Sequence, residues 1–174
     1  MKIHSRIGIL FFFFLTFSFA PAALRHRYSF TSDASDSVSG ASGVLMNGAA
    51  ILKGQLVCDG VDDYVELPAA EIAVNAYSAI TLELWATQPT FNQGFSMTAA
   101  FGGRYSSGYG RDYLMLCTSR GDDVSRAAIA NTASSSNPWA YEVGVNGPEL
   151  NDGQEHFYAM TIDGSTLAYY IDGV

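Results

Sequence analysis

The stretch QLVCDGVDDYVELP, at Gln55–Pro68, decides the fold class of this chain. Two short apolar runs, Gln55–Cys58 and Tyr64–Leu67, flank the pentad Asp59–Asp63. Asp-Gly between β-prone segments is a strong local hairpin signal, because glycine accepts the positive φ that such turns require. In the second run the residues alternate with period two, which is typical of a strand with one buried face, and Pro68 ends it. We therefore predict a β-hairpin here, within a β-rich fold.

The composition favours one β-rich extracellular domain. The 174-residue chain is 48% hydrophobic and only 15% charged, with 17 glycines and many aromatic residues. This length allows a sizeable core, and the profile is unlike that of a disordered segment or a helical bundle. The formal net charge of −8 argues against DNA or RNA as a partner, because phosphates require clustered Lys and Arg. It is compatible with neutral sugars or with cations.

Residues 1–22 have the pattern of a secretory signal peptide. Two basic residues precede a short apolar core, Ile7–Ala20, and Ala20-Pro21-Ala22 offers small residues at the spacing that signal peptidase needs. A membrane anchor is the alternative, but the apolar run is shorter than the roughly 20 residues needed to span a bilayer. We therefore expect a secreted or cell-surface domain over residues 23–174, with no stable membrane span after cleavage.

The rest of the chain predicts many short strands separated by turn residues. In the clearest one, Ile80–Thr87, the even-numbered residues are apolar and form the expected core face, whereas Glu83 and Trp85 lie on the other face. Asp163-Gly164-Ser165 predicts a hairpin, and one helical turn is expected at Ala70–Ala73. Many short strands with frequent turn signals are typical of a β-sandwich or jelly roll. The other expected strands are Arg25–Thr31, two within Val44–Leu52 broken at Asn47-Gly48, Phe95–Phe101, Tyr113–Thr118, Arg126–Ala130, Tyr141–Val145, Glu155–Ile162 and Thr166–Ile171.

Three segments together carry a resemblance to a known family: HRYSF at His26–Phe30, LVCDGVDDYVELP at Leu56–Pro68 followed by ITLELWAT at Ile80–Thr87, and HFYAMTIDGSTLAYYIDG at His156–Gly173. In this order they resemble the laminin G-like jelly-roll domains of the concanavalin A-like lectin/glucanase superfamily. The resemblance implies an all-β, two-sheet antiparallel β-sandwich (jelly roll) with one concave face, over essentially all of residues 23–174. Such chains usually continue for a few more strands, so we expect this domain to lack its last strands at Val174.

Glycoside hydrolysis is the enzymatic alternative, because related folds host glucanases. It needs two carboxylates flanking one bond, about 5–5.5 Å apart in retaining enzymes or about 6.5–9.5 Å apart in inverting ones. Same-face carboxylates on a strand sit two residues apart, but Glu83 is alone on its strand, and Asp62 and Asp63 are adjacent. No Gly-x-Ser-x-Gly elbow accompanies His26 or His156. We therefore expect no catalytic residues and no enzyme activity.

A metal site is a second hypothesis. Asp59, Asp62 and Asp63 cluster at one turn and Asp122-Asp123 at another, and calcium takes six to eight oxygens of the kind that such loops supply. No EF-hand spacing is present. The alternative, which we favour, is that Asp59-Gly60 shapes the turn through hydrogen bonds from side chain to backbone. Domains that this chain resembles often carry calcium, so calcium stays open as a cofactor without assigned ligands.

The chain has two cysteines, Cys58 and Cys117, each in an apolar, strand-like run. Secretion permits a disulfide between them, whereas a buried free thiol behaves as a small hydrophobic group. The separation of the two Cα atoms decides between these states, and both stay open at this point.

Carbohydrate binding is the third hypothesis. Sugars present apolar C–H faces that pack on flat aromatic rings, and nearby polar groups order their hydroxyls. The candidate residues are Trp139 and Tyr141 beside a serine-rich loop, Tyr105 and Tyr109 in the Gly-rich segment, and Trp85 next to Glu83. The alternative is packing for Trp85 and loop anchoring for the tyrosines. We predict a non-catalytic recognition module for a glycan or an extracellular protein, the alternatives being an adhesive or structural spacer of a larger surface protein and a fragment of a glycan-cleaving enzyme.

Overall fold

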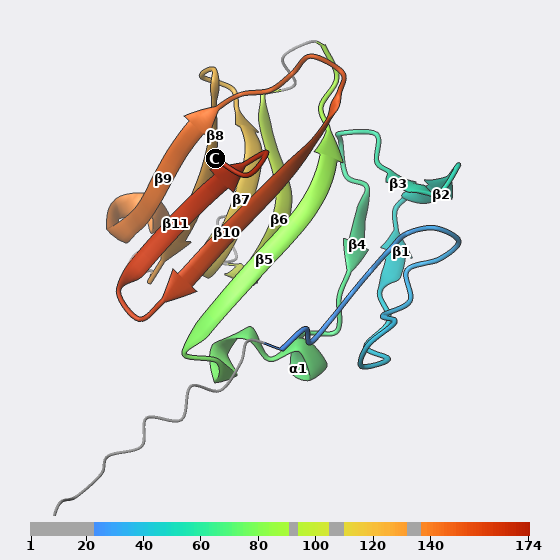
Figure 1. The fold of residues 1–174 in the computed structure, drawn as a ribbon, viewed down its shortest axis with the longest axis horizontal. Helices are drawn as coiled ribbons and strands as arrows, with labels where there is room; N and C mark the ends of the chain where they lie inside the picture. Colours follow the sequence, from blue (N-terminus) through green and yellow to red (C-terminus); the bar gives the residue numbers. More distant parts are fainter. Residues whose placement is uncertain (1–22, 91–93, 105–109, 132–136) are drawn as a thin grey trace, which may run out of the picture.

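Two antiparallel β-sheets face each other and confirm the predicted β-sandwich (Figure 1). The computed structural model describes residues 23–90, 94–104, 110–131 and 137–174. The front sheet in Figure 1 has the strand order β11-β10-β5, and the sheet behind it has the order β6-β7-β8-β9. The front strands are β5 (Ala79–Thr87), β10 (Glu155–Asp163) and β11 (Thr166–Ile171). The rear strands are β6 (Phe95–Arg104), β7 (Gly110–Arg120), β8 (Val124–Ala130) and β9 (Glu142–Pro148).

The N-terminal third adds two small ladders beside β5 (Figure 1). Strand β1 (Val44–Met46) pairs with β4 (Tyr64–Glu66), and β2 (Ala50–Leu52) pairs with β3 (Gln55–Val57). The helical segments of the described chain are short: α1 (Ala69–Ile72), η1 (Val74–Ala76) and η2 (Pro138–Tyr141). Among the described residues, none of these helices has the length and apolar character needed to cross a membrane.

The opening stretch forms two strands, β3 and β4, but the hairpin predicted between them is wrong. A turn at Lys53-Gly54 folds β3 back onto β2 instead, with φ of 54° at Lys53 and 80° at Gly54. Positive φ at both central residues is what a two-residue type I′ hairpin requires. Strand β4 pairs with β1, so the loop Asp59–Asp63 joins two different ladders. The side chain of Asn47 donates a hydrogen bond to the carbonyl of Asp62 (2.6 Å) and connects the two turns.

The strand predicted at Arg25–Thr31 is also wrong: only an isolated bridge between Tyr28 and Asp36 forms there. The carboxylate of Asp36 accepts a hydrogen bond from the backbone N–H of Arg27 (3.0 Å), which holds the segment against its own loop. Phe30 has a φ of 52°, in the left-handed region, and this turns the chain out of an extended path. The segment therefore forms a locally bonded loop.

The core lies between the two sheets. The predicted apolar face of β5 packs on it, so the assignment of the two faces of β5 is confirmed. The predicted hairpin after β10 is confirmed too, because β10 and β11 pair with Asp163 opposite Thr166. The buried cluster consists of Leu114, Leu116, Ala127, Tyr158, Met160 and Ile171, with Ile80, Leu82, Leu84 and Ala86 packed against it.

The two cysteines are free thiols: Cys58 is exposed, whereas Cys117 is buried in β7. No disulfide therefore crosslinks them, and the sandwich depends on the packing of its two sheets.

A substitution of Leu116 tests whether stability depends on this packing, because its side chain is fully buried in the core cluster. Leu116→Ala removes buried methyl groups and leaves a cavity, so the free energy of unfolding should fall by about 2–5 kcal/mol. Urea denaturation followed by tryptophan fluorescence measures this change. In the control variant Val61→Ala the altered side chain is 85% exposed, and the change should stay within about 0.5 kcal/mol. Equal effects of the two substitutions would contradict this location of the core.

Candidate functional site

The outer face of the front sheet carries aromatic residues from all three of its strands. Figure 1 looks onto this face, and none of the described helices or strands lies in front of it. In the antiparallel register Trp85 of β5 lies opposite Phe157 of β10, and Glu83 lies opposite Ala159. Ala159 in turn lies opposite Tyr170 of β11. Residues opposite each other in a ladder point to the same face, so Trp85, Phe157 and Tyr170 share the outer one.

Exposed Trp85 forms an aromatic pair with half-buried Phe157. Their ring centroids lie 5.0 Å apart with the planes tilted by 49°, a favourable arrangement for two aromatic rings. The alternative that Trp85 is a packing residue is wrong, because it is 65% exposed. Beside the pair lies an open hollow of about 400 Å³, lined by Trp85, Phe157, Asp172 and Gly173. We call these four residues the aromatic platform.

Hydrogen bonds hold the carboxylate of Asp172 at the rim of the platform. It accepts one from the backbone N–H of Phe157 (2.9 Å), and the Asp172 N–H donates to the Phe157 carbonyl (2.9 Å). The other oxygen of Asp172 lies 2.7 Å from Nδ1 of His156, whose Nε2 lies 3.2 Å from Asp152. The bonds from His156 and Phe157 lower the pKa of Asp172 below its usual range, so the carboxylate is ionised at neutral pH.

The other predicted carbohydrate-binding residues do not join the platform. Trp139 and Tyr141 are exposed on η2, which directly precedes β9. The far end of β9 leads to β10 and the platform, so η2 lies at the opposite end of the sandwich from Trp85 (Figure 1). Tyr105 and Tyr109 lie outside the described residues. The partners of Trp85 were missed in the sequence because they come from β10 and from the turn after β11.

The outer face of the rear sheet holds a polar cluster that the sequence reasoning missed. Arg126 donates through Nε to Glu142 (2.5 Å) and through Nη1 to Asn146 (2.5 Å), and the Tyr113 hydroxyl donates to the second oxygen of Glu142. Gly144 leaves room for the guanidinium, since a Cβ there would lie 2.7 Å from it. Burial and the bond to Glu142 raise the pKa of Tyr113. The sequence signal for this cluster is Arg126, the single charged residue in the strand VSRAAIA.

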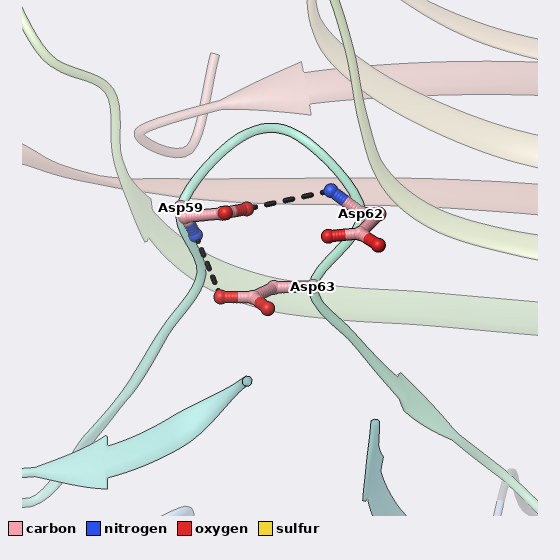
Figure 2. A group of neighbouring side chains, drawn as sticks. All are labelled: Asp59, Asp62 and Asp63. Carbon is pink, nitrogen blue, oxygen red and sulfur yellow. Dashed lines mark hydrogen bonds between the residues drawn. The ribbon is translucent and has the colours of Figure 1, made fainter. Parts of the chain in front are cut away.

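The turn Asp59–Asp63 brings three carboxylates together (Figure 2). One ligand atom from each of Asp59, Asp62 and Asp63 lies within 4.8 Å of the others. Asp59 accepts hydrogen bonds from the N–H groups of Val61 (2.8 Å) and Asp62 (3.4 Å), and Asp63 accepts one from Asp59 (3.0 Å). The bond from Val61 is the main cause of the lowered pKa of Asp59. These bonds support the interpretation that the carboxylates shape the turn, and three oxygens would be half or fewer of those that calcium takes.

At the other acidic turn, Asp122 pairs with Arg120 across 2.6 Å. The pair leaves that carboxylate with a cationic partner within its own turn, which accounts for it without a metal ion.

The comparison with family models gives one match. Residues 59–174 match Laminin_G_3, described as the concanavalin A-like lectin/glucanases superfamily. The matched range includes β5, β10 and β11, and with them all four residues of the aromatic platform. Neither the comparison with curated proteins nor that with solved structures gives a match. The resemblance inferred from the sequence is thereby confirmed.

The contacts of His156 predict a pH-dependent stability. Its bonds to Asp172 and Asp152 raise its pKa above the ordinary 6.5, so its contribution is present below about pH 6.5 and is lost as the pH rises through the raised value. The pKa values of both aspartates lie below the ordinary 3.8, so their contribution is present above that pH and is lost in stronger acid.

Urea unfolding of wild type and His156→Asn measures this effect. The stability difference between them should be larger at about pH 5.5 than at about pH 8.5, because only the protonated imidazole binds both carboxylates as a cation. An equal difference at the two pH values would contradict the assignment.

Proposed function

Because the chain belongs to the concanavalin A-like lectin/glucanase superfamily, in its laminin G-like branch, we propose that it is a secreted, non-catalytic module that binds a glycan at the aromatic platform. Laminin G-like domains are typically binding modules, usually extracellular, and they bind glycans or extracellular proteins. Family membership supports recognition in general; the choice of a glycan and of this face rests on the platform itself.

The pairing of exposed Trp85 with half-buried Phe157 is the observation that carries the proposal. An indole that is 65% exposed beside a second ring offers the flat apolar surface on which the C–H face of a sugar packs. Asp172 adds the polar group, since each carboxylate oxygen keeps a lone pair after accepting its hydrogen bond and can order a sugar hydroxyl. The hollow beside the rings is wide open to solvent, so a sugar residue can lie against them from outside.

Two features support a non-catalytic role. On β5 Glu83 has no second carboxylate on the same face. On the rear sheet both oxygens of Glu142 are bonded, one to Arg126 and one to Tyr113. Glycoside hydrolysis needs two free carboxylates flanking one bond, and neither β5 by itself nor the fully bonded Glu142 supplies such a pair. A spacer domain, in contrast, does not require a largely exposed tryptophan paired with a second ring beside a hollow. Recognition is therefore favoured over a purely structural role.

A glycan array tests the proposal, using the chain expressed and secreted from its full sequence, with calcium and with a chelator. Trp85→Ala should weaken glycan binding by at least about 10-fold, because it removes the stacking surface. Trp139→Ala is the matched control: it removes the other tryptophan at the opposite end and should leave binding intact. Loss of binding in Trp139→Ala alone would move the site to η2. A folded protein that binds no glycan would exclude this function and leave adhesion, and sensitivity to the chelator would add a metal to the site.

For residues 1–22 we propose a signal peptide that is removed on secretion, leaving the domain over residues 23–174. Expression in a secreting host should release a protein whose new N-terminus lies at or near Ala23, as determined by N-terminal sequencing. Secreted or membrane-bound protein that retains Met1 would contradict the assignment.

A further inference from the structure

The aromatic platform lies on an acidic face. Asp172 of the platform is exposed, as are Glu83, two residues before Trp85 on β5, and Glu155, which lies on the same face opposite Thr87. Strands β5, β10 and β11 contribute no Lys or Arg to either of their faces. Within the described chain, neither Glu83 nor Glu155 forms an ion pair. The face therefore combines aromatic rings with two carboxylates that form no ion pair within the described chain, Glu83 and Glu155, and with Asp172, one oxygen of which contacts His156.

We propose that the glycan bound here carries protonated amines, so that the ligand class is an amino sugar without its N-acetyl group. This inference rests on the function proposed above and specifies its ligand. A cation placed over the face of a tryptophan is attracted by the negative potential of the ring, and exposed Trp85 offers that face. Carboxylates at the rim bind an ammonium group through charge-assisted hydrogen bonds.

The position of Asp172 fits an ammonium group better than a neutral hydroxyl. Its carboxylate lines the same hollow as Trp85 and Phe157, so a sugar stacked on the rings can place a substituent against it. The bond from the Phe157 N–H and the contact with His156 fix the orientation of this carboxylate, and each oxygen keeps a lone pair for a further donor. An ammonium group supplies three donors and the opposite charge.

The same charges disfavour acidic glycans. A sulfate or carboxylate stacked on the platform would lie among Glu83, Asp172 and Glu155, with no Lys or Arg on these strands to receive it and with His156 already bonded to Asp172 and Asp152. The net charge of the chain, −8, adds a long-range field that attracts cationic ligands and repels anionic ones. A neutral sugar would stack on the rings and offer the carboxylates only uncharged hydroxyl donors, which form weaker hydrogen bonds than an ammonium group. The electrostatics therefore rank amino sugars first, neutral sugars second and acidic sugars last.

Calorimetric titration of the full secreted chain tests this ranking with three probes: a glucosamine oligomer, the N-acetylated oligomer of the same length, and a heparin oligosaccharide. The glucosamine oligomer should bind at least about 10-fold more tightly than its acetylated counterpart, and raising the salt concentration should weaken it, because exposed charge pairs are screened. Heparin should not bind.

Variants that remove one negative charge show which carboxylates bind the ammonium groups of the ligand. Glu83→Gln and Asp172→Asn should each weaken binding of the glucosamine oligomer several-fold, and by a larger factor than they weaken binding of the acetylated oligomer, because only the ammonium group loses an opposite charge. Asparagine also tolerates the positive φ of 50° at position 172. Glu71→Gln is the control: it makes the same change of charge on an exposed residue of α1, near the start of β5 and away from Trp85 (Figure 1). Should Asp172→Asn fail to fold, Glu83→Gln decides the question.

The outcomes separate this inference from the proposed function. Equal affinities for the two oligomers with no effect of salt or of Glu83→Gln, or tight binding of heparin, would overturn the amino-sugar assignment and leave glycan binding standing. Binding of neither oligomer by the folded protein would overturn both.

Discussion

Strand β5 imposes the constraint on which the rest of the structure depends. Its side chains alternate, so packing Ile80, Leu82, Leu84 and Ala86 on the core necessarily turns the odd-numbered residues outward. A large apolar side chain contributes up to about 1.5–3 kcal/mol when it is fully buried, so a one-residue shift of register, which would turn all of these partly buried residues outward, would be destabilising. The exposure of Trp85 is therefore a consequence of core packing, and the register with β10 then places Phe157 beside it.

The sequence predicted those parts of the structure that depend on local alternation. The two faces of β5, the hairpin of β10 and β11 and the helical turn after Pro68 all follow from periods and turn residues within about ten positions. The prediction of strand pairing was wrong where two turn signals lie close together in the sequence. As a hairpin signal, Asp59-Gly60 is the stronger dipeptide. The hairpin nevertheless forms at Lys53-Gly54, because this two-residue loop is shorter and brings β2 and β3 together at a lower cost in loop entropy.

The candidate site was predictable only in part, for a physical reason. Alternation identifies Trp85 as an outward residue, but Phe157 and Asp172 lie more than seventy positions away, and only the register of three strands brings them together. The same holds for Arg126, Glu142 and Tyr113, which come from three strands of the rear sheet. In a sequence, a site assembled across a sheet shows only as isolated outward-facing residues. It can be recognised only when the structure shows which residues of the adjacent strands lie beside them.

The carboxylates of this chain show how neighbours determine what one chemical group does. One carboxylate oxygen of Asp59 accepts hydrogen bonds from the N–H groups of Val61 and Asp62, and these bonds stabilise the turn. Glu142 has both oxygens bonded to side chains, which fills the outer face of the rear sheet with internal contacts. Asp172 is also held in place, yet it borders a hollow beside two aromatic rings, where a ligand can reach it. The front sheet is therefore the face on which fixed polar groups and open apolar surface meet, and this combination is what recognition requires.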